Sequence, residues 1–283
     1  MKLVSFRAKG APHYGVVVGS GVVDLTPRLG SKYPNIKAVI AANALSEAEK
    51  AAKGATADFQ VSGLEFDPAI PNPGKILCIG LNYEEHRQET GRPKVENPTI
   101  FIRFNDSQIG HMQPIIKPKN SDKVDFECEL AVIIGKGGRY ISQAAAYDHV
   151  AAYSCYNDVS IRDVQNHTSQ WTPGKNFPGT GPFGPFIVTR DEVGDLSGKN
   201  IRTRLNGKEM QHATFDQFIF PVPRVIEYIS RFTPLAPGDV IITGTPGGVG
   251  FRRDPPVYMK AGDTVEIEID GVGLLKNPII AET

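Results

Sequence analysis

The residues best placed to do chemistry are acids that alternate along one apolar stretch. Val124–Ile134 has the composition of a strand, in which alternate side chains share a face, so Asp125, Glu127 and Glu129 would point the same way. That face then turns apolar and becomes buried. Two carboxylates about 7 Å apart on a half-buried face repel each other and lose hydration unless a cation lies between them. This pair alone is more typical of a solvated strand edge, and a metal site is the alternative.

A third acid strengthens the metal interpretation. Asp158 follows the predicted strand Val150–Asn157, and an acid at the end of a strand can be aimed into a cleft. No histidines or cysteines occur at zinc-ligand spacing. Three hard oxygen ligands from Glu127, Glu129 and Asp158 favour Mg²⁺ or Mn²⁺, with Ca²⁺ as the ion that a crystal could hold instead. They also leave coordination positions for water and substrate.

A histidine and a glutamate form a second candidate pair. His86 and Glu89 are at i and i+3 of a short helix predicted over Tyr83–Thr90, which we expect Asn82 to cap and Gly91 to end. A carboxylate beside an imidazole fixes its tautomer and supports its cation, as a general base requires. On spacing alone, an ordinary surface pair is the simpler interpretation.

Taken together and in order, these motifs resemble the fumarylacetoacetate hydrolase superfamily. No single motif is decisive, but the ordered set is specific and covers most of Lys75–Pro278. The matching elements are Gly80-Leu81-Asn82-Tyr83 with His86 and Glu89, Asp125–Leu130, Asn157–Gln165, Gly174-Lys175, Gly184-Pro185, Pro237–Ile241 and Thr243-Gly244-Thr245-Pro246.

The resemblance implies a role for each of these residues. It implies a β-rich roll, usually homodimeric, around a Mg²⁺ or Mn²⁺ site. Its metal carboxylates fall on Glu127, Glu129 and Asp158, its histidine–glutamate dyad on His86 and Glu89, its active-site lysine on Lys175, and its substrate contacts on Arg162, Gln165 and Thr245. In isolation each of the last four has an ordinary structural explanation, so the ordered set carries the assignment.

The reaction implied is metal-dependent hydrolysis of a carbon–carbon bond in a small 2,4-diketo acid of the acylpyruvate type. His86, oriented by Glu89, would activate the attacking water, and Lys175 would stabilise the developing negative charge. The products would be pyruvate or a related acid. Alternatives on the same site are a decarboxylase of oxaloacetate or another β-keto acid, and a hydratase or isomerase of unsaturated keto acids. A non-catalytic binding module is a further, less favoured reading.

Two loops set this sequence apart. Pro178, Gly179 and Pro182 give the segment after Lys175 its own shape, which leaves substrate identity open. We expect Gly91–Asn97 to be a mobile lid, so that the adjoining dyad assembles when the lid closes. The glycine-rich segment 244–250 lacks the spacing of a nucleotide-binding loop, and we interpret it as a flexible turn beside the site.

The elements that must position these residues form an α+β fold with short helices. Residues 1–68 are predicted as a small α/β module, similar to one that bacterial members of the superfamily carry, with short strands and a helix over Ile36–Lys53. A proline-rich linker around Pro68, Pro71 and Pro73 separates it from a β-rich catalytic domain over residues 69–283. There the Asn206-Gly207 pair predicts a hairpin, and Pro223–Phe232 an amphipathic helix.

Composition limits the partners. The 283 residues carry 31 basic and 31 acidic side chains, which gives no electrostatic footprint for nucleic acid or an anionic membrane. The expected partner is a small anionic keto acid. Three widely spaced cysteines argue against a disulfide framework. No signal peptide or membrane-length apolar run is recognised, so we expect a cytoplasmic protein.

Overall fold

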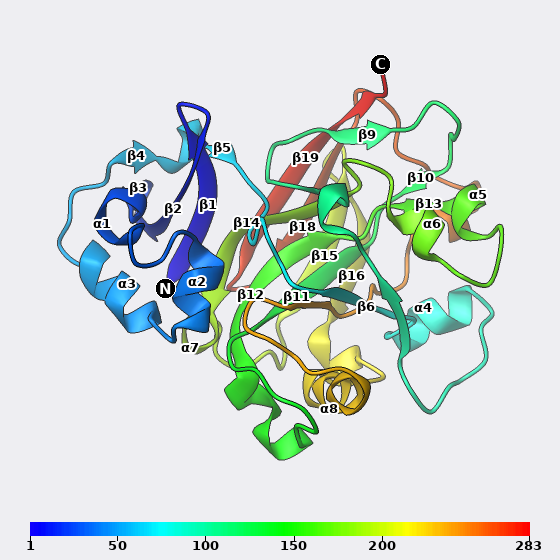
Figure 1. The fold of residues 1–283 in the computed structure, drawn as a ribbon. Coiled ribbons are helices and arrows are strands. Elements are labelled where there is room, and N and C mark those ends of the chain that lie inside the picture. Colours follow the sequence, from blue (N-terminus) through cyan, green and yellow to red (C-terminus); the bar gives the residue numbers. More distant parts are fainter.

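The computed structural model describes all 283 residues as two packed sheets, with a separate two-stranded sheet and short helices around them (Figure 1). The larger sheet is mixed and twelve-stranded. Its spatial order is β4 (Phe59–Gln60), β3 (Gly21–Asp24), β2 (Ala11–Val18), β1 (Lys2–Ala8), β14 (Gly181–Thr189), β12 (Val150–Asn157), β11 (Cys128–Ile134), β17 (Val240–Ile242), β6 (Ile76–Gly80) and β7 (Thr99–Ile102), with β5 (Glu65–Phe66) beside β1 and β8 (Gln108–Ile109) beside β14.

The smaller sheet packs against the middle of the larger one. Its five strands are, in order, β16 (Lys208–Thr214), β15 (Asn200–Leu205), β18 (Thr264–Ile269), β19 (Gly273–Ala281) and β9 (Ile115–Lys117). Alternate residues of β11, such as Leu130 and Val132, join a core with Ile201 and Ile267 of this sheet. The intervening Ala131 and Ile133 join a second core on the opposite face. Both faces of β11 are therefore buried, and acids at its start lie inside the protein.

The helices are α1 (Thr26–Leu29), α2 (Ile36–Ala41), α3 (Leu45–Ala52), α4 (Glu84–Glu89), α5 (Arg162–Gln165), α6 (Thr172–Lys175), α7 (Arg190–Val193) and α8 (Val222–Phe232). The amphipathic α8 buries Val222, Val225, Ile226 and Ile229, and so follows the prediction closely. Figure 1 shows α4, α5 and α6 together on the side away from the N-terminal strands. None of the helices is long and apolar enough to cross a membrane.

The N-terminal segment shares its sheet with the rest of the chain. β1 pairs antiparallel with β14, placing Lys2 opposite Val188, and Leu3 joins the core that contains Ile76 and Cys78. The predicted boundary at residue 68 stays a prediction. The single helix predicted over Ile36–Lys53 is wrong, because the backbone turns at Asn43 (φ +53°) and divides the segment into α2 and α3.

The predicted α+β, β-rich fold class is confirmed. The hairpin at Asn206 and Gly207 is also present, with φ of +52° and +79° in its two turn residues. The continuous strand predicted over Val124–Ile134 is wrong. Its first part, β10 (Val124–Asp125), pairs with β13 (Ser160–Ile161), whereas β11 pairs with β12, so the strand breaks where its partner changes. The three cysteines are buried and unpaired.

Candidate active site

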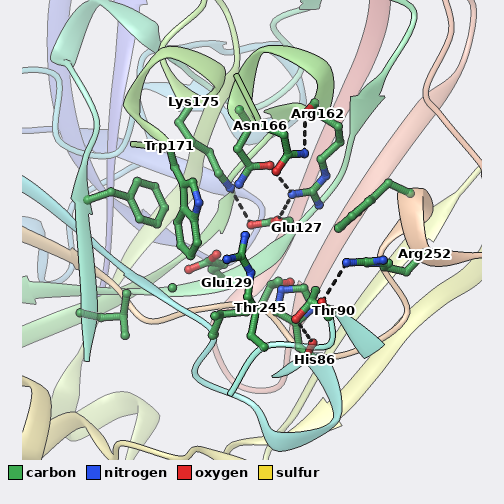
Figure 2. A pocket seen from close by; sticks show the side chains of 17 residues that line it. His86, Thr90, Glu127, Glu129, Arg162, Asn166, Trp171, Lys175, Thr245 and Arg252 are labelled. Carbon is green, nitrogen blue, oxygen red and sulfur yellow. Dashed lines mark hydrogen bonds and ion pairs between the residues drawn. The ribbon is translucent and has the colours of Figure 1, made fainter. Parts of the chain in front are cut away.

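A polar cavity of about 330 Å³ lies beside α4, α5 and α6 (Figure 2). Its volume is at the low end of the roughly 300–1,000 Å³ usual for small-molecule sites. Most of the predicted site residues line it. They are His86, Glu127, Glu129, Arg162, Gln165, Lys175 and Thr245.

Three carboxylates converge at this cavity, two of them in its lining. Glu127, Glu129 and Asp158 each offer an oxygen within 4.8 Å of the others, and all three residues are at least 95% buried. Glu127 occupies the break between β10 and β11, and Asp158 follows β12. The Asp158 amide donates to the Glu127 carbonyl at 2.9 Å, which ties the two segments together. The structure thus brings together the three residues predicted as metal ligands.

Basic side chains hold two of these acids. Lys175 Nζ lies 2.8 Å from Glu127 Oε2 and 2.5 Å from Asp158 Oδ2, and Arg162 Nη1 lies 2.7 Å from Glu127 Oε1. Figure 2 shows both cations bonded to Glu127. Burial alone would raise the pKa of Glu127, but Lys175 and Arg162 outweigh it and lower that pKa well below its usual range. Glu127 is therefore an anion.

Glu129 has no basic partner. Its Oε2 accepts only the Gly244 amide, at 2.5 Å. Burial, followed by repulsion from Asp158 and Glu127, raises the pKa of Glu129 well above its usual range. A buried carboxylate in this position lacks a cation, and a hard divalent ion among three carboxylates would provide one. The donor set fits Mg²⁺ or Mn²⁺.

The histidine–glutamate dyad is assembled. His86 Nδ1 and Glu89 Oε1 are 2.7 Å apart, and Glu89 Oε2 accepts the Gly248 amide at 3.0 Å. This leaves Nε2 of the buried His86 ring for the cavity. The expectation that the dyad assembles when the 91–97 segment closes as a lid stays a prediction. The segment after α4 does reach the cavity, through Arg92.

The predicted helix cap is also wrong. Tyr83 is the N-cap residue of α4, with no side-chain capping bond. Asn82 is fully buried, and its amide instead bonds the backbone of Phe220 and Thr243. Asn82 therefore joins the start of α4 to the end of β17, beside the site. Gly91 does follow the helix, with φ of +68°.

The glycine-rich segment holds carboxylates and is not merely a turn. The amides of Gly244, Gly248 and Gly250 donate to Glu129, Glu89 and Asp125 respectively. Gly244 and Gly248 adopt φ of +95° and +93°, and a Cβ on Gly250 would lie 1.9 Å from the Val257 carbonyl oxygen. Glycine is required because the backbone must approach these acids closely.

Arg162 offers a free donor to a ligand. Its Nε binds Asp125 Oδ2 at 2.8 Å and its Nη1 binds Gln165 Oε1 at 2.9 Å, but the buried Nη2 has no partner. A buried N–H without a partner is costly unless a ligand accepts it. Asp125, expected on the same face as Glu127 and Glu129, instead fixes Arg162 and the amides of Gly250 and Phe251.

Sequence reasoning missed two positioning residues. Arg103 is 97% buried and holds Asp158 Oδ1 at 2.6 Å, and Gln211 donates to the Thr245 hydroxyl at 2.8 Å. An arginine directly after an apolar strand was the only signal for Arg103. Nothing in the sequence around Gln211 indicated its role. Trp171 also lines the cavity and packs edge-on against Phe101.

A β-rich roll around a buried three-carboxylate centre defines a class of small-molecule enzymes. The family model for the C-terminal region of fumarylacetoacetate (FAA) hydrolase matches residues 75–280. The chain therefore belongs to the fumarylacetoacetate hydrolase family, and it is an enzyme of that family. The likeness of residues 1–68 to the N-terminal module of bacterial members stays a prediction.

Relatives match over nearly the whole length. The mitochondrial oxaloacetate tautomerase fahd2 of Xenopus laevis is 38% identical over 289 aligned residues, covering 99% of this chain and 90% of that protein. The fumarylacetoacetate hydrolase of Exiguobacterium antarcticum is similar at a TM-score of 0.83 and 31% identity, with full coverage of both chains. The maleylpyruvate hydrolase of Sphingobium sp. SYK-6, solved with manganese(II) and pyruvate, is similar at a TM-score of 0.84 and 28% identity, again over both full chains.

Proposed function

We propose that this protein is a divalent-metal-dependent tautomerase that interconverts the keto and enol forms of oxaloacetate. The alternatives raised above named oxaloacetate as the substrate of a decarboxylase and isomerisation for unsaturated keto acids, and the relatives support an isomerisation of oxaloacetate better than the hydrolase. The observation that carries the proposal is the 38% identity to an oxaloacetate tautomerase across 99% of the chain. The cavity adds an oriented imidazole and, elsewhere in its lining, an unpartnered guanidinium N–H, as a keto acid requires.

Substrate binding would use the polar groups on the cavity wall. Arg162 Nη2 would bind the carboxylate next to the keto group, with Gln165 and the Thr245 hydroxyl beside it. Glu127, Glu129 and Asp158 would hold Mg²⁺ or Mn²⁺, which when bound supplies Lewis-acid stabilisation of negative charge on the keto oxygen. Asp125 brings the number of carboxylates at the centre to four, and three cations lie against them. A bound dication would therefore change the summed charge of these groups from −1 to +1, which favours an anionic substrate. The cations are Arg103, Arg162 and Lys175.

Proton transfer would fall to the dyad. His86 Nε2 faces the cavity, and Glu89 holds Nδ1 as the donor of their shared hydrogen bond, so Nε2 is the basic atom. It would take a proton from the carbon between the two carbonyl groups of the keto form, and the imidazolium so formed would give that proton to the enolate oxygen, which completes the enol. The reverse direction would move the same proton from oxygen back to carbon. Lys175 would supply a fixed positive charge in the same cavity. Burial alone would lower the pKa of Lys175, but Asp158 and Glu127 raise it above its usual value.

Hydrolysis of an acylpyruvate is the second candidate. The same dyad could activate a water, and the maleylpyruvate hydrolase with manganese(II) and pyruvate has a similar structure. Decarboxylation of oxaloacetate is the third. Tautomerisation requires only proton transfer, hydrolysis consumes water and cleaves a carbon–carbon bond, and decarboxylation releases carbon dioxide. The three reactions therefore differ in their products.

A product-resolved assay tests the proposal. Purified protein is stripped of metal and then given Mg²⁺ or Mn²⁺ with oxaloacetate, and the keto–enol change is followed by ultraviolet absorbance. Parallel reactions with acetylpyruvate and with oxaloacetate are analysed for pyruvate, acetate and carbon dioxide. We expect metal-dependent acceleration of tautomerisation that far exceeds cleavage. Faster cleavage of acetylpyruvate would establish the hydrolase instead, and faster carbon dioxide release the decarboxylase.

A further inference from the structure

Two arginines line the cavity without an ionic partner. Arg252 ends a short 3₁₀ helix (Gly250–Arg252), and Arg92 lies in the segment after α4. Both side chains are exposed. Arg252 Nη2 donates to the carbonyl of Thr90 at 2.9 Å, and no carboxylate lies within ion-pair distance of either guanidinium. Uncompensated cations at the opening of an enzyme cavity attract and orient an anion.

One aromatic ring separates Arg252 from the buried arginine of the site. The guanidinium carbon of Arg162 lies 4.2 Å from the centre of the Phe251 ring, and that of Arg252 lies 4.8 Å from it. A ring face attracts cations, so Phe251 stabilises two guanidinium groups that would repel each other in direct contact. The Phe251 amide donates to Asp125, which also binds Arg162. Both arginines are therefore placed by the same short segment.

Arg92 is positioned by α4 and not by the 250–252 segment that carries Arg252. Its backbone amide and carbonyl bond Arg87 of α4, at 3.2 and 2.6 Å, so its place relative to His86 is fixed by the helix end. Arg92 and Arg252 thus come from two different segments that meet at Thr90 (Figure 2 shows the Arg252–Thr90 contact). The cavity has one guanidinium at its buried end and two at its opening.

We propose that Arg252, assisted by Arg92, binds the carboxylate of the substrate that is remote from the keto acid group. The enzyme would then select 2-keto dicarboxylates over 2-keto monocarboxylates of the same length. This inference rests on the proposed function and specifies its substrate class. Arg162 takes the first carboxylate deep in the cavity, and Arg252 takes the second at its opening.

The competing role for Arg252 is structural. Its bond to Thr90 fastens the end of α4, which carries His86 and Glu89. Loss of that bond alone would disturb the dyad, and would lower turnover equally for every substrate. Loss of a carboxylate contact would affect only ligands that have the second carboxylate. A matched pair of ligands therefore separates the two roles.

Oxaloacetate and 2-oxobutyrate form that pair, because they differ only in a carboxylate against a methyl group at the far end. Trp171 is the only tryptophan of the chain and lines the cavity, so its fluorescence reports binding to the Mg²⁺-loaded protein. We expect Arg252→Gln to weaken oxaloacetate binding about tenfold and to leave 2-oxobutyrate binding unchanged. Arg252→Lys should recover part of the loss. Lys53→Gln, an exposed cation in the N-terminal segment, is the control for charge alone.

Turnover provides the second measurement. The KM for oxaloacetate should rise about tenfold in Arg252→Gln, more than kcat falls. Equal weakening of both ligands, or wild-type protein that binds both equally well, would overturn the assignment. A wild-type enzyme that binds oxaloacetate in an Arg252-dependent way without tautomerising it would reject the proposed function and retain Arg252 as the carboxylate-binding residue.

Discussion

Lys175 Nζ lies 2.5 Å from Asp158 Oδ2, and both side chains are almost completely buried. The same ammonium is 2.8 Å from Glu127, so one lysine bridges two of the three candidate metal ligands. The third, Glu129, is the one without a basic partner. Lys175 and a dication would therefore share the charge of the same acids, and their effects on stability should depend on each other.

Replacing Lys175 tests this dependence. In metal-free buffer, Lys175→Met should lower the free energy of unfolding by about 3 kcal/mol, because removal of one partner from a buried ion pair leaves an uncompensated charge. Mn²⁺ should restore much of the loss. Denaturant unfolding with chelator and with Mn²⁺ measures both effects. Lys276→Met, which breaks the half-exposed pair with Glu266, should cost less than about 1 kcal/mol and show no metal rescue. Equal losses in the two variants would contradict the shared-charge account.

Glu129→Gln should separate metal binding from folding. The amide keeps an oxygen for the Gly244 amide but removes a charge that burial and two neighbouring acids disfavour. We expect metal-free stability equal to or above that of the wild type, and loss of the rise in Tm on adding Mn²⁺. The control is Glu209→Gln, at an exposed position on β16, which should retain that rise. A full metal response in Glu129→Gln would remove Glu129 from the ligand set.

Glu89→Gln should act on proton transfer alone. Glutamine can still accept the Gly248 amide, but its NH₂ group would face His86 Nδ1 and favour the wrong tautomer. Turnover should fall by about a hundredfold, the lower range for loss of general acid–base catalysis. The rise in Tm with Mn²⁺ should be unchanged. Glu85→Gln, on the same helix and exposed, is the control. Unchanged turnover in Glu89→Gln would reject the dyad.

A histidine outside the site should make stability depend on pH. Burial, and then the charge of Lys276, lower the pKa of His111 from 6.5 to about 4, and its Nδ1 accepts the Lys276 amide at 3.0 Å. Between about pH 4 and pH 6.5, His111 is therefore protonated in the unfolded chain but neutral in the folded protein. Stability is fully present above about pH 6.5 and falls as the pH drops toward 4, by at most about 3 kcal/mol from this group.

His111→Asn supplies the measurement. The asparagine oxygen can replace Nδ1 as the acceptor but does not titrate. The plot of unfolding free energy against pH should therefore be flatter between pH 6.5 and 4 than for the wild type. His167→Asn, in an exposed loop, should leave the slope unchanged. Identical slopes for His111→Asn and the wild type would show that other groups control acid stability.

The sequence predicted local features of the site better than distant ones. Glu127, Glu129 and Asp158 could be grouped because strand periodicity and strand ends are local properties, and His86 and Glu89 because helical spacing is. The structure brings these residues together, while their catalytic roles stay predictions. The hairpin at Asn206 was equally local and was predicted correctly.

Long-range partners account for what was missed. Asn82 looked like a helix cap, but its partners, Phe220 and Thr243, are more than a hundred residues away. Arg103 meets Asp158, and Gln211 meets Thr245, only after the sheets have formed. The break in the strand at Phe126 depends on a change of partner strand. Local pattern contains no information about such pairings, which tertiary packing decides.

The amides of Gly244, Gly248 and Gly250 connect the proposed ion site, the proton-transfer pair and, through Asp125, the substrate arginine to one stretch of backbone. Inserting or deleting a single residue there would displace all three in concert, so the length of this stretch should be intolerant of change. Substrate specificity can therefore change more easily by substitution of Arg92 and Arg252, because replacing these side chains does not alter the length of that backbone segment.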